Sequence, residues 1–398
     1  MKILMLTPYL PYPLTSGGQT RSYNLIKNLS KKHEITLFSL IKDDKEKKYI
    51  PELEKYCKKV AVFKRPKSPW TLRNILLTGF GPYPFLVIRN LVPEEKRALK
   101  EEMAKEKYDL IHAETFYVMP HIPNTDIPVL LVDQTIEYLV YKHYVEEQSP
   151  FFLRPLLWID ILKLRFWETY YWKLSNRVVA MSDADRKAMK ELVPSLRVDI
   201  VPNGIDTEYF SEKKEISIRT PKVLYVGNFS WLQNVEAVEA LVDKVWAKIK
   251  DEIPKVRLWI VGKNITDRVK RLKAPEIEIT EGMPDIRDAY RASSVLVAPI
   301  EGPGGTRLKI LEAMASSLPV VTTSVGAEGL GLEDGKQAII KNDYEDLVES
   351  AIEVLKDKKL AKRLGVSGKK FVQENYTWQK SAELLDNIYK ELVYDTKT

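Results

Sequence analysis

Short apolar segments alternate with helical patterns along nearly the whole chain of 398 residues. Helical patterns such as Gln19–Ser30 and Glu94–Lys105 separate these segments in the first half of the chain. Continuous apolar strands separated by helices are typical of a parallel sheet that is covered on both faces. The strands expected in the first 200 residues are Lys2–Thr7, Glu34–Ser39, Val60–Phe63, Leu110–His112, Val129–Val132, Val178–Met181 and Val198–Val201.

The alternation is interrupted near residue 204, where Pro202, Asn203 and Gly204 form a turn signal and a polar stretch follows. We therefore predict an α/β fold with two Rossmann-like domains, 1–203 and 204–378, which face each other across a cleft, and a final helix within 379–398. The strands expected in the second domain are Lys222–Val226, Val256–Val261, Ile277–Thr280, Val295–Ala298 and Pro319–Thr323, with helices at Val235–Ile249, Ile265–Lys273 and Asp285–Ala292.

The charge balance restricts the partners. A net charge of +7 is compatible with nucleic acid, an anionic membrane surface or a phosphorylated small molecule. Lysines and arginines are spread among nearly as many acidic residues, without a long basic run, which argues against nucleic acid. The single cysteine, Cys57, excludes an intramolecular disulfide and a cysteine-based zinc site.

The segment from Val295 to Leu330 carries the strongest functional signal. An apolar strand is followed by Gly302, Gly304 and Gly305, a helical pattern that starts near Thr306, and a second buried strand. A helix that starts from a glycine loop presents backbone N–H groups that hold phosphate. We therefore expect Gly304, Gly305 and Thr306 to contact a phosphate.

The helix predicted in this segment has one apolar face and one face with Gly305, Lys309, Glu312 and a serine. A solvated face would carry more charge than this. We expect Arg307 and Lys309 to neutralise a diphosphate, and Glu312, one turn further on, to accept hydrogen bonds from ribose hydroxyls. A diphosphate followed by a diol at this distance indicates a nucleotide-sugar.

The stretch GGTRLKILEAMASSLPVVTTSVGAEGL resembles the donor-site signature of the family 4 retaining glycosyltransferases. The resemblance implies the B-type glycosyltransferase fold, in which a terminal helix crosses back onto the first domain. In that signature seven residues separate two glutamates, the first near the donor sugar and the second on the ribose. Glu312 matches the second, whereas Gly304 stands in place of the first. Whether Glu301, three residues upstream, replaces it stays open.

Members of this family usually carry a cationic pair after the strand that opens the second domain. Here that loop reads GNFSWLQN and contains no lysine or arginine. We expect Arg307 and Lys309 to take this role, because a leaving diphosphate needs nearby positive charge from whichever loop supplies it. Asn228 and Trp231 are expected at the donor pocket, and packing of Trp231 between the domains is the alternative.

The loop after the first strand, PYLPYPLTSGGQTR, is a second phosphate candidate. Gly17 and Gly18 precede a helix expected to start near Gln19, so backbone N–H groups would meet the donor phosphates from the opposite side. A plain glycine-rich turn is the alternative. The resemblance favours the functional interpretation, since relatives carry a similar Pro-rich loop, a glycine pair and an arginine like Arg21.

Histidines and carboxylates give weaker signals. His112 ends a strand and precedes Glu114, and a lone histidine in such a place is more often structural than catalytic. Gln134 stands about where many relatives carry a histidine that faces the reacting sugar. Asp183 and Asp185 open a helix and fit an N-cap rather than a metal site. We expect neither a metal nor a cofactor besides the donor substrate.

Two apolar segments bear on membrane contact. Charges interrupt Phe151–Leu174, and Asn74–Ile88 is short and contains glycine and proline, so neither is expected to span a bilayer. A buried helix and an apolar loop are the main interpretations, and peripheral contact with an anionic membrane is the alternative. Met1 leads into a strand pattern without signal-peptide features, so we expect a cytoplasmic location, at the inner face of the membrane if that contact exists.

These signals predict a retaining, metal-independent glycosyltransferase that moves a sugar from a nucleotide diphosphate to a hydroxyl of a glycan or lipid-linked acceptor. Gly18, Arg307 and Lys309 would act at the phosphates. A nucleotide-sugar epimerase and an inactive nucleotide-sugar-binding protein are the alternatives, since the first family glutamate is missing. A dinucleotide oxidoreductase does not fit, because Arg307 occupies the last position of the G-x-G-x-x-G pattern. The sequence leaves the donor base, the acceptor and the oligomeric state open.

Overall fold

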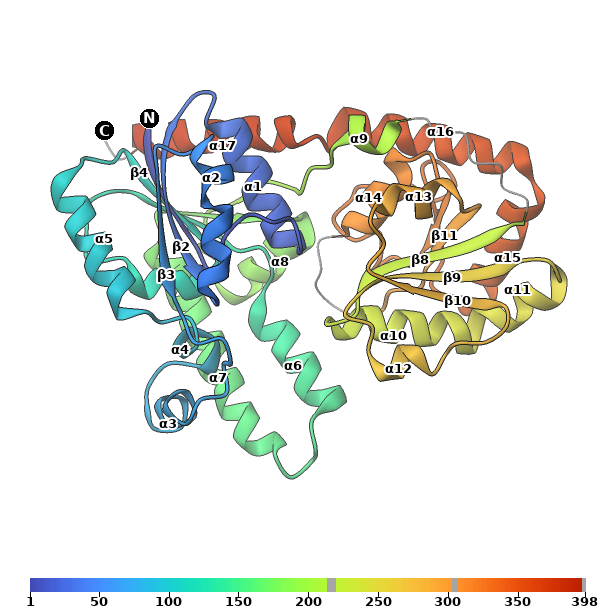
Figure 1. Ribbon diagram of the computed structural model, residues 1–398, viewed down its shortest axis with the longest axis horizontal. Helices are drawn as coiled ribbons and strands as arrows, with labels where there is room; N and C mark the ends of the chain where they lie inside the picture. The colour runs from blue at the N-terminus through green and yellow to red at the C-terminus, as the bar shows by residue number, and fades with distance from the viewer. Residues whose placement is uncertain (213–219, 303–306, 396–398) are drawn as a thin grey trace. The chain divides into compact units, whose positions relative to one another are not determined.

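A computed structural model describes residues 1–212, 220–302 and 307–395. The chain divides into two compact units (Figure 1). The first unit combines Met1–Asn203 with Trp378–Thr398, and the second unit is Gly204–Thr377. Each unit contains one parallel sheet with helices packed against it. The predicted fold class, two Rossmann-like α/β units, is confirmed.

The first unit contains a seven-stranded sheet in the order β3-β2-β1-β4-β5-β6-β7. The strands are β1 (Lys2–Thr7), β2 (Glu34–Ile41), β3 (Lys59–Lys64), β4 (Leu110–Glu114), β5 (Val129–Val132), β6 (Arg177–Ala180) and β7 (Val198–Ile200). The helices are α1 (Gly17–Leu29), η1 (Asp44–Tyr49), α2 (Ile50–Glu54), α3 (Leu72–Phe80), α4 (Phe85–Ile88), α5 (Pro93–Lys105), η2 (Phe116–His121), α6 (Glu137–Gln148), α7 (Arg154–Leu174), α8 (Asp183–Leu192) and α17 (Trp378–Asp395).

The second unit contains a six-stranded sheet in the order β10-β9-β8-β11-β12-β13. Its strands are β8 (Lys222–Asn228), β9 (Arg257–Lys263), β10 (Ile277–Glu281), β11 (Val295–Ala298), β12 (Val320–Thr322) and β13 (Ile339–Ile340). Its helices are α9 (Thr207–Ser211), α10 (Leu232–Ala240), η3 (Leu241–Trp246), α11 (Ala247–Glu252), α12 (Asp267–Lys270), α13 (Ile286–Arg291), α14 (Leu308–Ala315), α15 (Tyr344–Lys356) and α16 (Lys358–Asn375).

The strand order explains where each sheet places its loops. In both sheets the first strand in the chain is the third strand of the sheet, and the strand order reverses direction there. In open parallel sheets ligands bind outside the carboxyl ends of the strands at such a switch point. The loops after β1 and β4, and those after β8 and β11, therefore lie at the expected ligand edge of their sheets.

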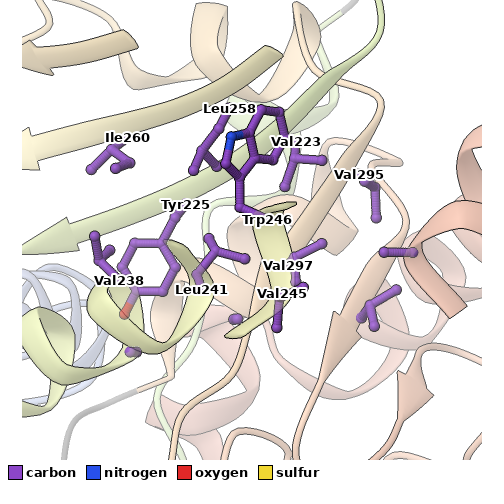
Figure 2. Packing of buried hydrophobic residues seen from close by; sticks show 14 of the residues in the cluster. Val223, Tyr225, Val238, Leu241, Val245, Trp246, Leu258, Ile260, Val295 and Val297 are labelled. Atoms are coloured by element: carbon purple, nitrogen blue, oxygen red, sulfur yellow. The ribbon is translucent and has the colours of Figure 1, made fainter. Parts of the chain in front are cut away.

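The core of the second unit forms because apolar side chains of β8, β9 and β11 meet the helix that follows β8. Figure 2 shows Val223 and Tyr225 of β8 beside Val238, Leu241 and other side chains of that helix. Tyr225 is fully buried, and its hydroxyl reaches toward the carboxyl edge of the sheet, where Asn234 contacts it. A core tyrosine thus contributes a polar atom to the ligand edge.

The last helix belongs to the first unit, as the resemblance implies. Helix α17 packs on α1, and Leu385 and Tyr389 join the core cluster that contains Leu25 and Ile26. The C-terminal helix therefore completes the hydrophobic core around β1 rather than extending the second unit.

Two expectations about the first unit are wrong. Residues 74–88 are not a loop, because Leu72–Phe80 and Phe85–Ile88 form helices α3 and α4. Helix α7 buries only one face, which includes Ile161, Leu164 and Trp172. Its opposite side exposes large apolar residues. The carboxylates of Asp160 and Glu168 do not cover that side, because they accept hydrogen bonds from the backbone N–H groups of Phe85 and Glu137. In Figure 1, α6 and α7 project together from the rest of the unit.

Candidate active site

The strongest predicted site lies at the start of α14, after β11. The helix begins at Leu308 rather than near Thr306, because Arg307 adopts a left-handed conformation with φ 53°, which is incompatible with a helical turn. The expected phosphate contacts of Gly304, Gly305 and Thr306 lie outside the described residues. Arg307, Lys309 and Glu312 are described and belong to the first turns of α14 or its cap.

Lys309 reaches back from α14 to the carboxyl end of β8. Its ammonium group donates hydrogen bonds to the Tyr225 hydroxyl, at 2.9 Å, and to Oδ1 of Asn234, and it lies 4.3 Å from the centre of the Tyr225 ring. Burial, assisted by the positive charge of Arg307, lowers the pKa of Lys309 to about 7, and Glu312 opposes this shift. The ammonium ion therefore lacks a full counter-charge in the ligand-free protein.

Arg307 brings a second positive charge to the same place. Its side chain is 8% exposed, and its guanidinium lies 3.8 Å from the carboxylate of Glu328. The charge of Arg307 adds to the lowering of the pKa of Lys309 and opposes the rise of the pKa of Tyr225. Two cations that repel each other in a partly desolvated site favour an anionic ligand.

Glu312 lies one turn after Lys309 and accepts a hydrogen bond of 2.6 Å from the Tyr290 hydroxyl. Burial raises the pKa of Glu312, whereas Tyr290 and Lys309 counteract this rise. Tyr290 comes from α13, the helix before β11. The carboxylate keeps acceptor capacity after this one hydrogen bond, which suits a hydroxyl-bearing ligand.

The loop after β8 surrounds Lys309. The backbone carbonyl of Asn228 accepts a hydrogen bond of 2.8 Å from the side chain of Asn234. The side-chain oxygen of Asn228 accepts a hydrogen bond of 2.9 Å from the side chain of Asn264. Trp231 is the N-cap residue of α10 and is 48% exposed, whereas Phe229 is buried in the core. Asn228 and Asn234 therefore shape the site, and the exposed Trp231 ring is available to a ligand.

One glycine, Gly262, makes the close approach of β8 and β9 possible at this edge. A Cβ atom on Gly262 would lie 1.9 Å from the Gly227 carbonyl oxygen and 2.7 Å from the Phe229 ring. Any larger residue at position 262 would push the β8 loop away. The glycine thus helps to fix the loop that carries Asn228.

Glu301 accepts a hydrogen bond of 2.6 Å from the Tyr344 hydroxyl and is otherwise exposed. Tyr344 is the first residue of α15. Among the residues that the structure describes, no other predicted site residue forms a hydrogen bond or an ion pair with Glu301, so its replacement of the missing family glutamate stays a prediction.

In the first unit, α1 begins at Gly17 rather than near Gln19, because Ser16 caps it through the Gln19 N–H group. Both glycines therefore lie in the first helical turn, whose N–H groups have no partner within the helix. A Cβ atom on Gly18 would lie 2.5 Å from the Tyr9 hydroxyl and 2.9 Å from the Gln134 side chain. Only glycine leaves this helix start accessible beside Tyr9.

Behind Gly18 lies a buried polar network. Glu114 contacts the Nε2 atom of His112 at 3.1 Å and accepts a hydrogen bond from Gln134, which also donates to Tyr9 at 2.8 Å. The second ring nitrogen of His112 contacts the hydroxyl of Tyr389. Both nitrogens of His112 therefore have protein partners and the ring is fully buried, which supports its structural interpretation.

Arg21 has a structural position as well. Its side chain is fully buried, and its guanidinium donates to the Pro202 carbonyl at 3.2 Å and to the Asn203 side chain at 3.1 Å. These contacts hold Pro202 and Asn203, where the first segment of this unit ends, against α1.

Sequence reasoning missed the two tyrosines that orient the site. Tyr225 lies in an apolar strand and Tyr290 in a short helix, where each has the spacing of a core residue. The ring of each is indeed buried, and only the hydroxyl reaches the site. The available signal was the presence of tyrosine instead of phenylalanine at a buried position that precedes a functional loop.

Comparison with known proteins assigns each unit to a family. The description "Glycosyltransferase Family 4" matches residues 15–209, and "Glycosyl transferases group 1" matches residues 220–357. An uncharacterised 44.6 kDa protein of the cps region of Klebsiella pneumoniae is 23% identical over 98% of this chain and 99% of its own length. An uncharacterised glycosyltransferase of Methanocaldococcus jannaschii is 24% identical over 98% of this chain and 99% of its own length.

Solved structures share the fold. Sucrose-phosphate synthase from Thermosynechococcus elongatus superimposes with a TM-score of 0.73 and 18% identity, covering 99% of this chain and 100% of that one. The HepE protein of Anabaena, solved in complex with UDP and glucose, gives a TM-score of 0.67 and 16% identity, covering 98% of this chain and 99% of that one.

Proposed function

We propose that this chain, which belongs to the glycosyltransferases of group 1 and family 4, transfers a sugar with retention of anomeric configuration from a nucleotide diphosphate donor to an acceptor hydroxyl. That it is a glycosyltransferase follows from the family. The retaining outcome, the donor site and independence from metal are our proposals.

The observation that carries the donor site is the pair of cations at α14. Lys309 is held against the uncharged oxygens of Tyr225 and Asn234, and its lowered pKa favours an anionic ligand beside the ammonium group. The diphosphate of a nucleotide-sugar supplies that anion, and Glu312 would accept hydrogen bonds from its ribose. As the sugar leaves, charge grows on the diphosphate, and fixed cations stabilise it more strongly than they stabilise the substrate.

The chemistry requires no protein nucleophile in this proposal. The leaving phosphate would help to deprotonate the acceptor hydroxyl on the same side of the sugar, which preserves the anomeric configuration. Arg307 and Lys309 would supply the positive charge that a divalent cation supplies elsewhere, so turnover should persist in EDTA. In the first unit, the accessible N–H groups of Gly17 and Gly18 are the further candidates for phosphate contact.

A thermal-shift screen against UDP-, GDP-, ADP- and dTDP-sugars tests donor binding. UDP-glucose is the first choice, since a structural neighbour was solved with it. A ligand at 100 times its dissociation constant adds about 2.7 kcal/mol to the free energy of unfolding, which gives a clear shift. Stabilisation by one nucleotide class supports the proposal, and silence across the panel overturns it. Isomerisation of the donor without an acceptor would instead identify an epimerase.

We further propose that the first unit contacts an anionic membrane surface through α3 and α7. The exposed apolar residues of α7 follow helical spacing: Leu156, Ile159, Leu162, Phe166 and Tyr170. Among the described residues, no helix is long and apolar enough to cross a membrane. Parallel contact with the membrane interface suits such one-sided helices.

Helix α3 adds Leu72, Ile75 and the 91% exposed Phe80. Lys163 ties the two helices together, because its ammonium donates to the carbonyls of Thr78 and Gly81 at 2.6 and 2.8 Å.

The charges on these helices favour an anionic surface. The exposed charged residues of α3 and α7 are the cations Arg73, Arg165 and Lys173. The two carboxylates of α7 are used internally: Asp160 accepts from the backbone N–H of Phe85, and Glu168 is fully buried. Within α3 and α7, exposed apolar side chains combined with exposed cations match anionic lipid headgroups.

A further inference from the structure

Three basic residues of the first unit lie at the carboxyl edge of its sheet. Lys42 directly follows β2, Arg65 directly follows β3, and Arg89 is the C-cap residue of α4. The backbone of Arg65 is held to β2 by a hydrogen bond from its N–H group to the carbonyl of Ile41, at 2.9 Å. The fold thus gathers three cations from separate segments at the edge where parallel sheets bind ligands.

In the described part of the chain, none of the three side chains forms a hydrogen bond or a close ion pair with another residue. The Arg65 side chain is 9% exposed, and the Nε atoms of Arg65 and Arg89 are buried without any hydrogen bond. Buried guanidinium groups are normally paired, because removing an unpaired charge from water is costly. The arrangement is explained if a ligand supplies the missing acceptors.

The three cations also repel one another. Burial lowers the pKa of Lys42, and the charges of Arg65 and Arg89 lower it further. Burial and then the charge of Arg89 lower the pKa of Arg65 in the same way. Lys42 and Arg65 directly follow Ile41 and Lys64, which pair across β2 and β3, so the two residues lie side by side at this edge, and the charge of Arg89 acts on both.

The carboxylates near this region offset only part of its charge, and Glu46 is the one that opposes the lowering of the pKa of both Lys42 and Arg65. Glu46 accepts hydrogen bonds from the backbone N–H groups of Lys42 and Asp43, at 2.8 and 2.9 Å, which hold it in a capping box. Burial raises the pKa of Glu137 to about 7 despite the charge of Arg89, so this carboxyl is only partly ionised at neutral pH. A net positive charge remains at the edge of the sheet.

We propose that Lys42, Arg65 and Arg89 bind a phosphate monoester carried by the acceptor. A phosphate monoester has a charge between −1.5 and −2 at neutral pH and three acceptor oxygens, which balances three cations better than a single carboxylate does. Tyr117 and Tyr141 lie close enough to Arg89 for its charge to influence them, and their hydroxyls remain protonated donors. This inference rests on the proposed function, since it names the acceptor of the same reaction.

Binding of sn-glycerol 3-phosphate in the absence of donor tests the site directly. The variants Lys42→Gln, Arg65→Gln and Arg89→Gln each remove one charge, and Lys42→Gln keeps the test valid if a buried arginine variant fails to fold. Lys100→Gln, at an exposed position of α5, is the matched control for net charge. Lys309→Ala reports binding at the donor site instead. Glycerol is the uncharged control ligand.

We expect glycerol 3-phosphate to stabilise the wild type. The affinity for glycerol 3-phosphate should fall about tenfold or more in each of Lys42→Gln, Arg65→Gln and Arg89→Gln, which are called the triad variants. Lys100→Gln and Lys309→Ala should bind normally. The ligand-free Lys42→Gln protein should melt no earlier than the wild type, because it loses a repulsive charge. Absence of binding to the wild type, or binding that Lys309→Ala abolishes and the triad variants retain, would overturn the proposal.

Two further arms identify the source of the phosphate and separate this proposal from the previous one. Phosphatidic acid in detergent micelles, with phosphatidylcholine micelles as control, tests a lipid-linked phosphate. Binding of both phosphate compounds supports a lipid-linked source, and binding of the soluble compound alone supports a soluble acceptor. The donor screen is independent of this test. If the variants of Lys42, Arg65 and Arg89 still bind UDP-glucose, their donor site is intact. If no nucleotide-sugar binds but glycerol 3-phosphate does, only the proposed transferase role is rejected.

Discussion

At the scale of single residues, Lys309 is the group whose surroundings most need a ligand. Within residues 1–212, 220–302 and 307–395, the hydrogen-bond partners of its ammonium are the uncharged oxygens of Tyr225 and Asn234, and the charge of Arg307 works against its protonation. These contacts orient the cation without neutralising it. The side chain is therefore arranged before the donor arrives, and little rearrangement is needed on binding.

The lowered pKa of Lys309 predicts a pH dependence of donor binding. The pKa is about 7 in the free protein, and a bound diphosphate should raise it, so the protonated form binds. Affinity for UDP-glucose should be highest below pH 7 and fall by up to tenfold per pH unit above it. Titration calorimetry from pH 6 to pH 9 measures this, with proton uptake near pH 7. If the affinity of Lys309→Ala for UDP-glucose fell with pH as steeply as that of the wild type, another group would be responsible for the pH dependence.

Glu312 gives a second prediction, for the nucleoside rather than the phosphates. Replacing Glu312 with alanine should weaken donor binding by about 1.5–3 kcal/mol, the value of a hydrogen bond to a charged group. Tyr290→Phe, which removes only the 2.6 Å hydrogen bond to Glu312, should have a smaller effect. Equilibrium titration with UDP-glucose measures both variants. Unchanged affinity in Glu312→Ala would reject the ribose role.

The sequence could place Lys309 and Glu312 one turn apart on the same helix because helical spacing is local information, whereas their roles at a donor stay a prediction. It could not identify Tyr225 as the partner of Lys309, because that contact joins residues 84 positions apart. Arg307 shows a third case: it was expected in the helix start, and its left-handed backbone delays the helix to Leu308. Tertiary contacts and backbone conformation at a loop end are not encoded in periodicity.

At the scale of elements, strands were predictable to within a few residues, because buried parallel strands are continuous apolar runs. Strands β1, β5 and β11 match their expected bounds. Strand β13, Ile339–Ile340, has only two residues and gave no signal. The wrong predictions concern α3 and α7. Their apolar residues predict burial, but the sequence pattern does not show that no other element packs on the apolar face of each helix.

The uncovered faces of α3 and α7 predict membrane binding. The double variant Phe80→Ser and Phe166→Ser removes two exposed rings, so it should fold normally and bind vesicles less tightly. Sedimentation with phosphatidylglycerol–phosphatidylcholine vesicles measures this, and pure phosphatidylcholine should bind less of the wild type. Val366→Ser, an exposed apolar position on α16, is the control. If the wild type stays in the supernatant with anionic vesicles, the membrane proposal is wrong.

At the scale of the whole molecule, two similar α/β units carry different chemistry at the same edge of their sheets. The second unit places Arg307, Lys309 and Glu312 after its central strands. The first unit places Gly18 after β1 and the cations Lys42, Arg65 and Arg89 after β2, β3 and α4, and the Nε atoms of the two arginines are buried without a hydrogen bond. This division matches a reaction with two substrates, a nucleotide-sugar in one unit and a phosphorylated acceptor in the other.

The most direct test of the donor site is turnover of the Lys309→Ala variant, measured as UDP release from UDP-glucose or from the donor selected by the thermal-shift screen. Removing one preorganised group that stabilises developing charge should lower turnover by about 10² or more. Lys336→Ala, an exposed lysine paired with Glu333, should retain normal turnover. A correctly folded Lys309→Ala protein with near-normal turnover would contradict the assignment of the leaving diphosphate to α14.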